Sequence, residues 1–165
     1  QVRLPAHLDG LSGLVIPGGE STTIGKLAVA YGLIEPLRAF GRQHAMWGTC
    51  AGAIFLSKDI HRDQPLLELM DISVSRNAFG RQVDSFEVDL HVELGSQKNG
   101  SARPYHAVFI RAPLIDEVRG DARALAQLPD GRIVAAIQGR LLATSFHPEL
   151  TDDDRFHRYF LELSA

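Results

Sequence analysis

Residues 45–52 read Ala-Met-Trp-Gly-Thr-Cys-Ala-Gly, and the expected fold and chemistry follow from their pattern. The apolar run Ala45 to Thr49 has the composition of a buried strand, and Ala51 to Lys58 continues with a helical pattern. Cys50 therefore falls on the turn between a strand and a helix. A nucleophile flanked by small residues at such a turn is the nucleophile-elbow arrangement.

The helix that follows Cys50 favours a reactive sulfur. Free N–H groups and the positive end of the helix dipole stabilise a thiolate relative to the thiol. The N–H of Ala51, one residue after the nucleophile, is placed to stabilise an oxyanion. The alternative is a buried, inert cysteine, because that is the usual role of a lone cysteine.

The segments on both sides of this stretch alternate short apolar runs with helical patterns, which is typical of an α/β layered domain. We expect buried strands at 14–16 and 107–110, a further strand at 72–75, an antiparallel, half-exposed strand at 86–93, and a hairpin over 132–145. We expect helices at 23–31, 35–40 and 152–163. Ser21 or Thr22 is the expected N-cap of the first helix, and Thr151 that of the last, with three aspartates in its first turn.

Composition limits the class of protein. The 165 residues suit one domain spanning 1–165, and 45% hydrophobic with 22% charged residues excludes a disordered tail or a coiled coil. A net charge of -3 without a basic stripe argues against nucleic-acid binding. A single cysteine excludes an internal disulfide and Cys-rich zinc sites. No apolar run is long enough to cross a bilayer, so we expect a cytoplasmic protein.

A second chemical signal is Ser145-Phe146-His147-Pro148-Glu149. In an extended segment, residues i and i+2 point to the same face, so His147 and Glu149 can be neighbours. A carboxylate beside an imidazole orients the ring and stabilises its protonated form. An ordinary surface turn is the alternative.

A third signal follows the first strand, in Pro17-Gly18-Gly19-Glu20-Ser21. Glycines let the backbone approach a ligand and present N–H groups, although an ordinary strand-to-helix turn has the same composition. The Lys-Ser/Thr ending of a phosphate loop is absent. Taken together, Cys50 as nucleophile, His147 as proton shuttle, Glu149 as its orienter, and Gly19 and Ala51 as oxyanion donors suit acyl transfer through a thioester.

Several runs of this sequence resemble the glutaminase subunits of pyridoxal 5′-phosphate synthase, which are class I, triad-type glutamine amidotransferases. The resemblance covers nearly the whole chain and rests on residues 17–23, 48–52, 76–86, 109–113 and 145–150. It implies a three-layer, flavodoxin-like α/β domain with a mixed, mostly parallel central sheet. Family members also begin with a strand, a Leu-Gln-Gly loop and a helix that we expect to precede Gln1.

The resemblance assigns roles to individual residues. Cys50, His147 and Glu149 would form the catalytic triad. Glutamine would be held by Gly19, Glu20, Ser21, Arg76, Ile110 and Arg111. An arginine can bind the α-carboxylate of glutamine in bidentate form, and Glu20 can accept from its α-ammonium. A solvated surface charge is the alternative for each arginine.

The resemblance also implies a partner. The ammonia released from L-glutamine would pass to a separate synthase subunit, a (β/α)₈ barrel that builds pyridoxal 5′-phosphate, and this chain would need no cofactor or metal. Two other functions stay open at this point. One is a cysteine hydrolase or peptidase of the same fold class, and the other is a non-catalytic module that binds a partner.

Overall fold

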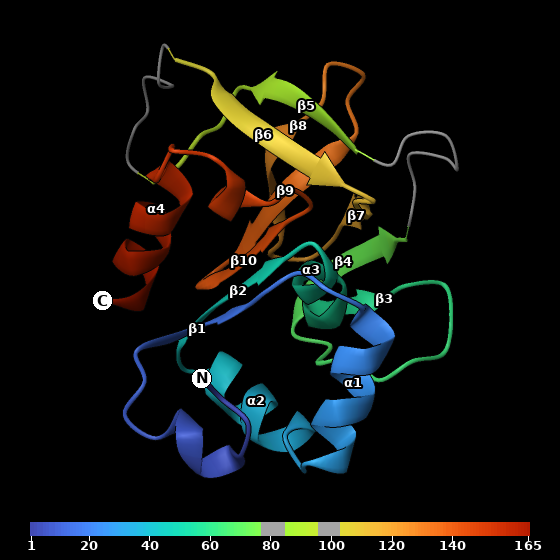
Figure 1. Ribbon diagram of the computed structural model, residues 1–165, viewed down its shortest axis with the longest axis vertical. Helices are drawn as coiled ribbons and strands as arrows, with labels where there is room; N and C mark the ends of the chain where they lie inside the picture. The colour runs from blue at the N-terminus through green and yellow to red at the C-terminus, as the bar shows by residue number, and fades with distance from the viewer. Residues whose placement is uncertain (77–84, 96–102) are drawn as a thin grey trace.

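The computed structural model describes residues 1–76, 85–95 and 103–165 of the chain (Figure 1). Its main sheet is mixed and has eight strands in the order β1-β2-β10-β9-β7-β4-β3, with β8 paired to β9. Strands β5 and β6 form a separate two-stranded sheet. The expected α/β fold with a mixed central sheet is confirmed.

The strands are β1 (Gly13–Ile16), β2 (Ala45–Thr49), β3 (Ser57–Asp59), β4 (Met70–Ser75), β5 (Ser85–Leu90), β6 (Tyr105–Ile110), β7 (Leu114–Val118), β8 (Arg123–Gln127), β9 (Ile133–Gln138) and β10 (Leu141–Thr144). The helices are η1 (Pro5–Leu8), α1 (Ser21–Ala30), α2 (Ile34–Gly41), α3 (Ala51–Leu56), η2 (Pro148–Leu150) and α4 (Arg155–Ser164), where η marks a 3₁₀ turn.

Strand β2 lies between two parallel neighbours, β1 and β10. Strands β3 and β4 are also parallel, whereas β9 pairs antiparallel with β10, β7 and β8, and β4 pairs antiparallel with β7. The carboxyl ends of parallel strands meet at one edge of a sheet, where ligands bind in α/β folds. The segments that follow β1, β2 and β10, which carry the three chemical signals of the sequence, therefore begin at one edge.

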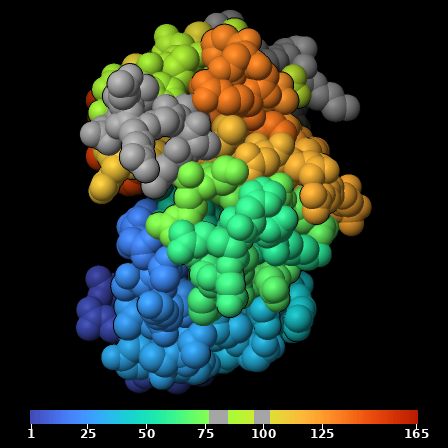
Figure 2. Space-filling view, turned by 90° about the vertical axis from the view of Figure 1, so that its right-hand side faces the viewer, coloured from blue at the N-terminus to red at the C-terminus, as the bar shows by residue number. Residues whose placement is uncertain are grey.

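Two hydrophobic clusters cover the two faces of the main sheet. Helices α1, α2 and α3 contribute to one cluster, which includes Leu37 and Phe55. Helix α4 and the β5–β6 ribbon contribute to the other, which includes Trp47 and Phe156. Figure 1 shows this three-layer order, with α1–α3 on one side and α4 and β5–β6 on the other. In the space-filling view, the N-terminal part of the chain up to β4 lies below the later strands (Figure 2).

Most expected elements are present. The strands at 14–16, 45–49 and 72–75 and the hairpin over 132–145 are confirmed as β1, β2, β4 and β9–β10. The antiparallel strand expected at 86–93 is present as β5, but it ends at Leu90. The expected burial of two strands is wrong in part. Val15 is 43% exposed on the edge strand β1, and β6 alternates buried and exposed residues because only one of its faces packs on the core.

The expected helix ends need correction. The helix after Cys50 ends at Leu56, because Ser57–Asp59 pairs with β4 as strand β3. Helix α1 is capped by Glu20, whose side chain accepts from the N–H of Thr23, and not by Ser21 or Thr22.

The start of the last helix also differs from expectation. Helix α4 begins at Arg155 with Asp154 as its N-cap residue, so Thr151 is not the cap and the three aspartates precede the helix. Strands β7 and β8 were not expected, since neither shows strict alternation of apolar and polar residues.

The run 77–84, which lies within the family-specific stretch 76–86, falls outside the described residues, as does most of the polar loop expected at 95–104. None of the helices in the described part of the chain is long and apolar enough to span a membrane.

Candidate active site

Cys50 occupies a strained turn between β2 and α3. Its backbone has φ 49° and ψ -108°, a conformation that residues with a side chain adopt rarely. Such strain persists where the surrounding structure holds it, and it is the geometry of a nucleophile elbow. The residue is 8% exposed.

Two glycines allow this turn to pack. A Cβ on Gly48 would lie 2.4 Å from the carbonyl carbon and oxygen of Gly52, and a Cβ on Gly52 would lie 2.0 Å from the carbonyl oxygen of Ile16. Both distances are far below van der Waals contact. The small residues around Cys50 are therefore required by close packing of β1, β2 and α3.

His147 lies beside both of its expected partners. Its Nδ1 lies 2.8 Å from Oε1 of Glu149. The side chain of Cys50 is the largest influence on the pKa of His147, and together with Glu149 it raises that pKa from 6.5 to about 9, against the opposite effect of burial. Both neighbours therefore favour the protonated imidazole.

The reason for the His147–Glu149 contact differs from the one expected. The two residues do not lie in an extended segment, because Pro148–Leu150 forms the 3₁₀ turn η2 with His147 as its N-cap residue. The side chain of His147 is 14% exposed and that of Glu149 is 51% exposed. The turn brings the carboxylate back to the ring from the solvent side.

A hydrogen bond and the packing of the preceding residue anchor the backbone of His147. Its N–H donates to the carbonyl of Val108 on β6 at 2.8 Å. The preceding Phe146 is fully buried, with its ring against those of Tyr105, Phe109 and Phe156. The packing of these aromatic rings thus fixes the position of the His147 backbone.

The loop after β1 lies directly against the cysteine and the histidine. A Cβ on Gly18 would lie 2.8 Å from Cε1 of His147 and 3.4 Å from Cβ of Cys50. Gly19 follows with φ +143°, a conformation that favours glycine. The loop that carries the expected oxyanion donor Gly19 therefore reaches the site. Gly18 lies in close contact with the site as well, although the sequence assigned it no role of its own.

The N–H of Ala51 has no hydrogen-bond partner within the described residues, whereas the N–H of Cys50 donates to the carbonyl of Thr144 at 2.8 Å. Of these two amides at the turn, only that of Ala51 is available to a substrate oxygen. This agrees with its expected role as an oxyanion donor.

Two of the expected glutamine-binding side chains contact each other. Arg76 forms an ion pair with Glu20 and donates to Oγ1 of Thr22 at 3.1 Å. Arg111, in contrast, forms no ion pair with any described residue, and it follows the exposed Ile110 at the end of β6 with φ 43°. Ser21 is 1% exposed, and its hydroxyl has no partner in the described part of the chain.

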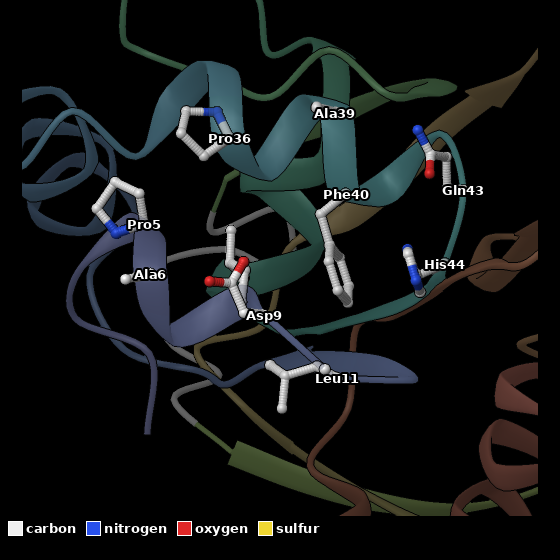
Figure 3. Close-up of a pocket in the computed structure, with 11 residues that line it drawn as sticks. Pro5, Ala6, Asp9, Leu11, Pro36, Ala39, Phe40, Gln43 and His44 are labelled. Carbon is white, nitrogen blue, oxygen red and sulfur yellow. The ribbon is translucent and has the colours of Figure 1, made fainter.

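A separate pocket of about 550 Å³ lies between η1 and α2. Figure 3 shows Pro5 and Asp9 on one side of it and Pro36 and Phe40 on the other. None of the candidate site residues lines this pocket. In residues 1–76, 85–95 and 103–165, no group of three or more His, Cys, Asp or Glu side chains could hold a metal ion.

Comparisons with known proteins agree with this geometry. The model of the SNO glutamine amidotransferase family matches residues 1–164. A Roseiflexus castenholzii protein named pyridoxal 5′-phosphate synthase subunit PdxT is 56% identical over 168 residues, which cover 99% of this chain and 86% of that protein. The PdxT of Deinococcus radiodurans is 53% identical over 172 residues, covering 100% of this chain and 84% of its own.

Solved structures show the same fold. A crystal structure described as a glutamine amidotransferase has a TM-score of 0.89 at 50% identity, covering 99% of this chain and 84% of that one. A glutamine amidotransferase of Thermotoga maritima has a TM-score of 0.54 at 14% identity, over 92% of this chain and 61% of that one, and shows the fold alone.

Proposed function

Because this chain belongs to the SNO glutamine amidotransferase family, we propose that its residues Cys50, His147 and Glu149 hydrolyse L-glutamine to L-glutamate and ammonia. The ammonia is supplied to a synthase subunit for the synthesis of pyridoxal 5′-phosphate, because the PdxT relatives are named as subunits of pyridoxal 5′-phosphate synthase. The position of His147, beside Cys50 and with Oε1 of Glu149 2.8 Å from its Nδ1, carries this proposal.

In the first step, the thiolate of Cys50 attacks the side-chain amide carbon of glutamine. The carbonyl oxygen becomes an oxyanion, which accepts from the N–H groups of Ala51 and Gly19. The C–N bond then breaks, and the proton of the His147 imidazolium passes to the leaving nitrogen to give ammonia. A glutamyl thioester remains on Cys50.

In the second step, water attacks the thioester carbon while the now neutral His147 accepts its proton. The C–S bond breaks, glutamate leaves, and the thiolate of Cys50 is restored beside a protonated His147. Glu149 orients the imidazole and stabilises its protonated form in both steps.

Substrate binding uses the charges of free glutamine. We assign the α-carboxylate to Arg111, which has no ionic partner in the described residues, with Arg76 as the second cation. Glu20 accepts from the α-ammonium, and Gly19, Ser21 and Ile110 complete the contacts.

The synthase subunit that receives the ammonia is proposed to be a (β/α)₈ barrel, docked where the ammonia leaves Cys50. Residues 1–165 act as one glutaminase domain in this proposal. A cytoplasmic location suits the single cysteine, since a reducing compartment keeps the thiol free.

The decisive experiment measures ammonia and glutamate released from L-glutamine, with and without the synthase subunit. Cys50→Ala and His147→Gln should each abolish release and leave the fold intact. His61→Gln is the matched control, because His61 is an exposed histidine paired with Asp59 and Asp116, and it should keep full activity. Turnover of peptides or esters but not of glutamine would support a cysteine hydrolase instead. No release with the synthase present would support a binding module.

A further inference from the structure

The backbone of Cys50 is held by a residue outside the triad. The N–H of Cys50 donates to the carbonyl of Thr144 at 2.8 Å, across the ends of the parallel strands β2 and β10. This bond holds the N–H of Cys50, a residue whose backbone is strained at φ 49°. Without it, the turn could relax toward an ordinary conformation and move the sulfur.

Thr144 also stands immediately before the segment that carries the base. It is the last residue of β10, and His147 follows three positions later. In between, the N–H of Ser145 donates to the carbonyl of Val134 at 2.8 Å. Thr144 therefore contacts the backbone of Cys50 and also begins the short segment that leads to His147.

The side chain of Thr144 is itself fixed by a buried hydrogen bond. Nε1 of Trp47 donates to Oγ1 of Thr144 at 3.1 Å, and the two residues are 1% and 0% exposed. A buried donor and acceptor that lost this bond would find no water to replace it. Trp47 precedes Cys50 by three residues on β2, so the bond joins the two strands just before the catalytic ends of both.

The indole of Trp47 is held in turn by helix α4. Its ring lies 6.3 Å from that of Phe156, 5.1 Å from that of His157 and 5.7 Å from that of Phe160, measured between centroids. Aromatic packing thus holds the donor in place, and the donor in turn restrains its acceptor on β10.

We propose that Trp47 and Thr144 are positioning residues that set Cys50 relative to His147 in the glutaminase reaction. This inference rests on the proposed function. Thr144→Val keeps the shape of the side chain and removes the acceptor, and Trp47→Phe keeps an aromatic ring and removes the donor. Each should lower kcat about tenfold and change KM less than twofold, because the candidate glutamine-binding side chains lie on other segments.

A loss of this kind differs from simple destabilisation. In the variants a looser contact between Cys50 and His147 should move the alkaline fall of kcat to lower pH. Thr144→Ser keeps the hydroxyl and should restore kcat. The double variant Trp47→Phe with Thr144→Val should be no slower than the slower single variant, since both remove one bond.

The control is Leu142→Val, which shortens a fully buried side chain on β10 opposite Trp47 and touches no hydrogen bond. It should lower Tm and leave kcat and the pH profile unchanged. The proposal is overturned if Thr144→Val matches Leu142→Val in kcat and pH profile at an equal loss of Tm.

The assay uses this chain in complex with the synthase subunit, and Cys50 alkylation by iodoacetamide is followed in parallel. If the wild-type complex releases no ammonia, the proposed function fails, but alkylation still tests the positioning. At pH 6, Thr144→Val should then be alkylated severalfold more slowly than Leu142→Val, and equal rates would refute the role.

Discussion

Arg76 forms an ion pair with Glu20, a residue 56 positions earlier in the chain, so two side chains expected to hold glutamine neutralise each other. Glu20 also caps helix α1 through the N–H of Thr23, which fixes the carboxylate at the end of the loop beside Gly19. Arg76 is thus positioned by protein contacts before any substrate arrives. The other candidate arginine, Arg111, has no such partner among the described residues.

This difference predicts unequal roles for the two arginines. Arg111→Gln should raise the KM for glutamine at least tenfold and change kcat less than threefold, because a charged hydrogen bond contributes about 1.5–3 kcal/mol to binding. Steady-state glutaminase kinetics measure both values. Arg119→Gln, which removes an exposed arginine paired with Glu117, should match the wild type. An unchanged KM in Arg111→Gln would remove Arg111 from the substrate site.

The close contact between Gly18 and His147 predicts a loss of rate from one methyl group. In Gly18→Ala the new Cβ would lie 2.8 Å from Cε1 of the imidazole, so the ring must shift from its place beside Cys50. A displacement of about 1 Å lowers kcat roughly a hundredfold. Gly131→Ala, at a turn with φ +87° and open space, should lose stability and keep kcat. Full activity in Gly18→Ala would mean that the loop moves aside.

The raised pKa of His147 predicts the alkaline limit of the reaction. The imidazolium donates the proton to the leaving ammonia, so kcat should be sustained below pH 9 and fall as pH rises through about 9. Glu149→Gln removes a charge and a strong acceptor that favour the protonated ring. In that variant kcat should fall severely, and its alkaline midpoint should move down toward 6.5. An unshifted midpoint would show that Glu149 does not act on the ring.

The packing around Gly52 predicts a failure of folding and not of chemistry. Gly52→Ala places a Cβ 2.0 Å from the carbonyl oxygen of Ile16, between α3 and β1, where no flexible side chain can yield. We expect a loss of about 3–5 kcal/mol in the free energy of unfolding, measured by urea denaturation. Gly139→Ala, with open space in the β9–β10 turn, should lose about 1 kcal/mol from its positive φ. Similar losses in both variants would contradict the packing argument.

Much of the site could be predicted from short stretches of sequence. The strand Ala45–Thr49, the turn at Cys50 and the helix after it follow from neighbouring residues, because an apolar run, two glycines and a helical pattern stand side by side. His147 and Glu149 are two residues apart, so their contact needs only a turn. The conformation of this turn was not predicted, since the 3₁₀ turn η2 and not an extended segment brings the two side chains together.

Other features left no local signal. Strand β7 pairs with β4, and β8 pairs with β9. Neither has a clear strand pattern in its sequence, so pairing within the sheet determines their conformation. Glu20 is the N-cap of α1, and its carboxylate also forms an ion pair with Arg76, which follows β4.

Local sequence predicts which residues have the chemistry and which short elements carry them, because strand and helix periods and turn glycines act over a few residues. How these elements meet depends on long-range packing. The parallel pairing of β1, β2 and β10 brings Gly18, Cys50 and His147 to one edge. The hydrogen bond between Trp47 and Thr144 joins two residues that are 97 positions apart. Such contacts depend on strand order and packing, which no single stretch of sequence encodes.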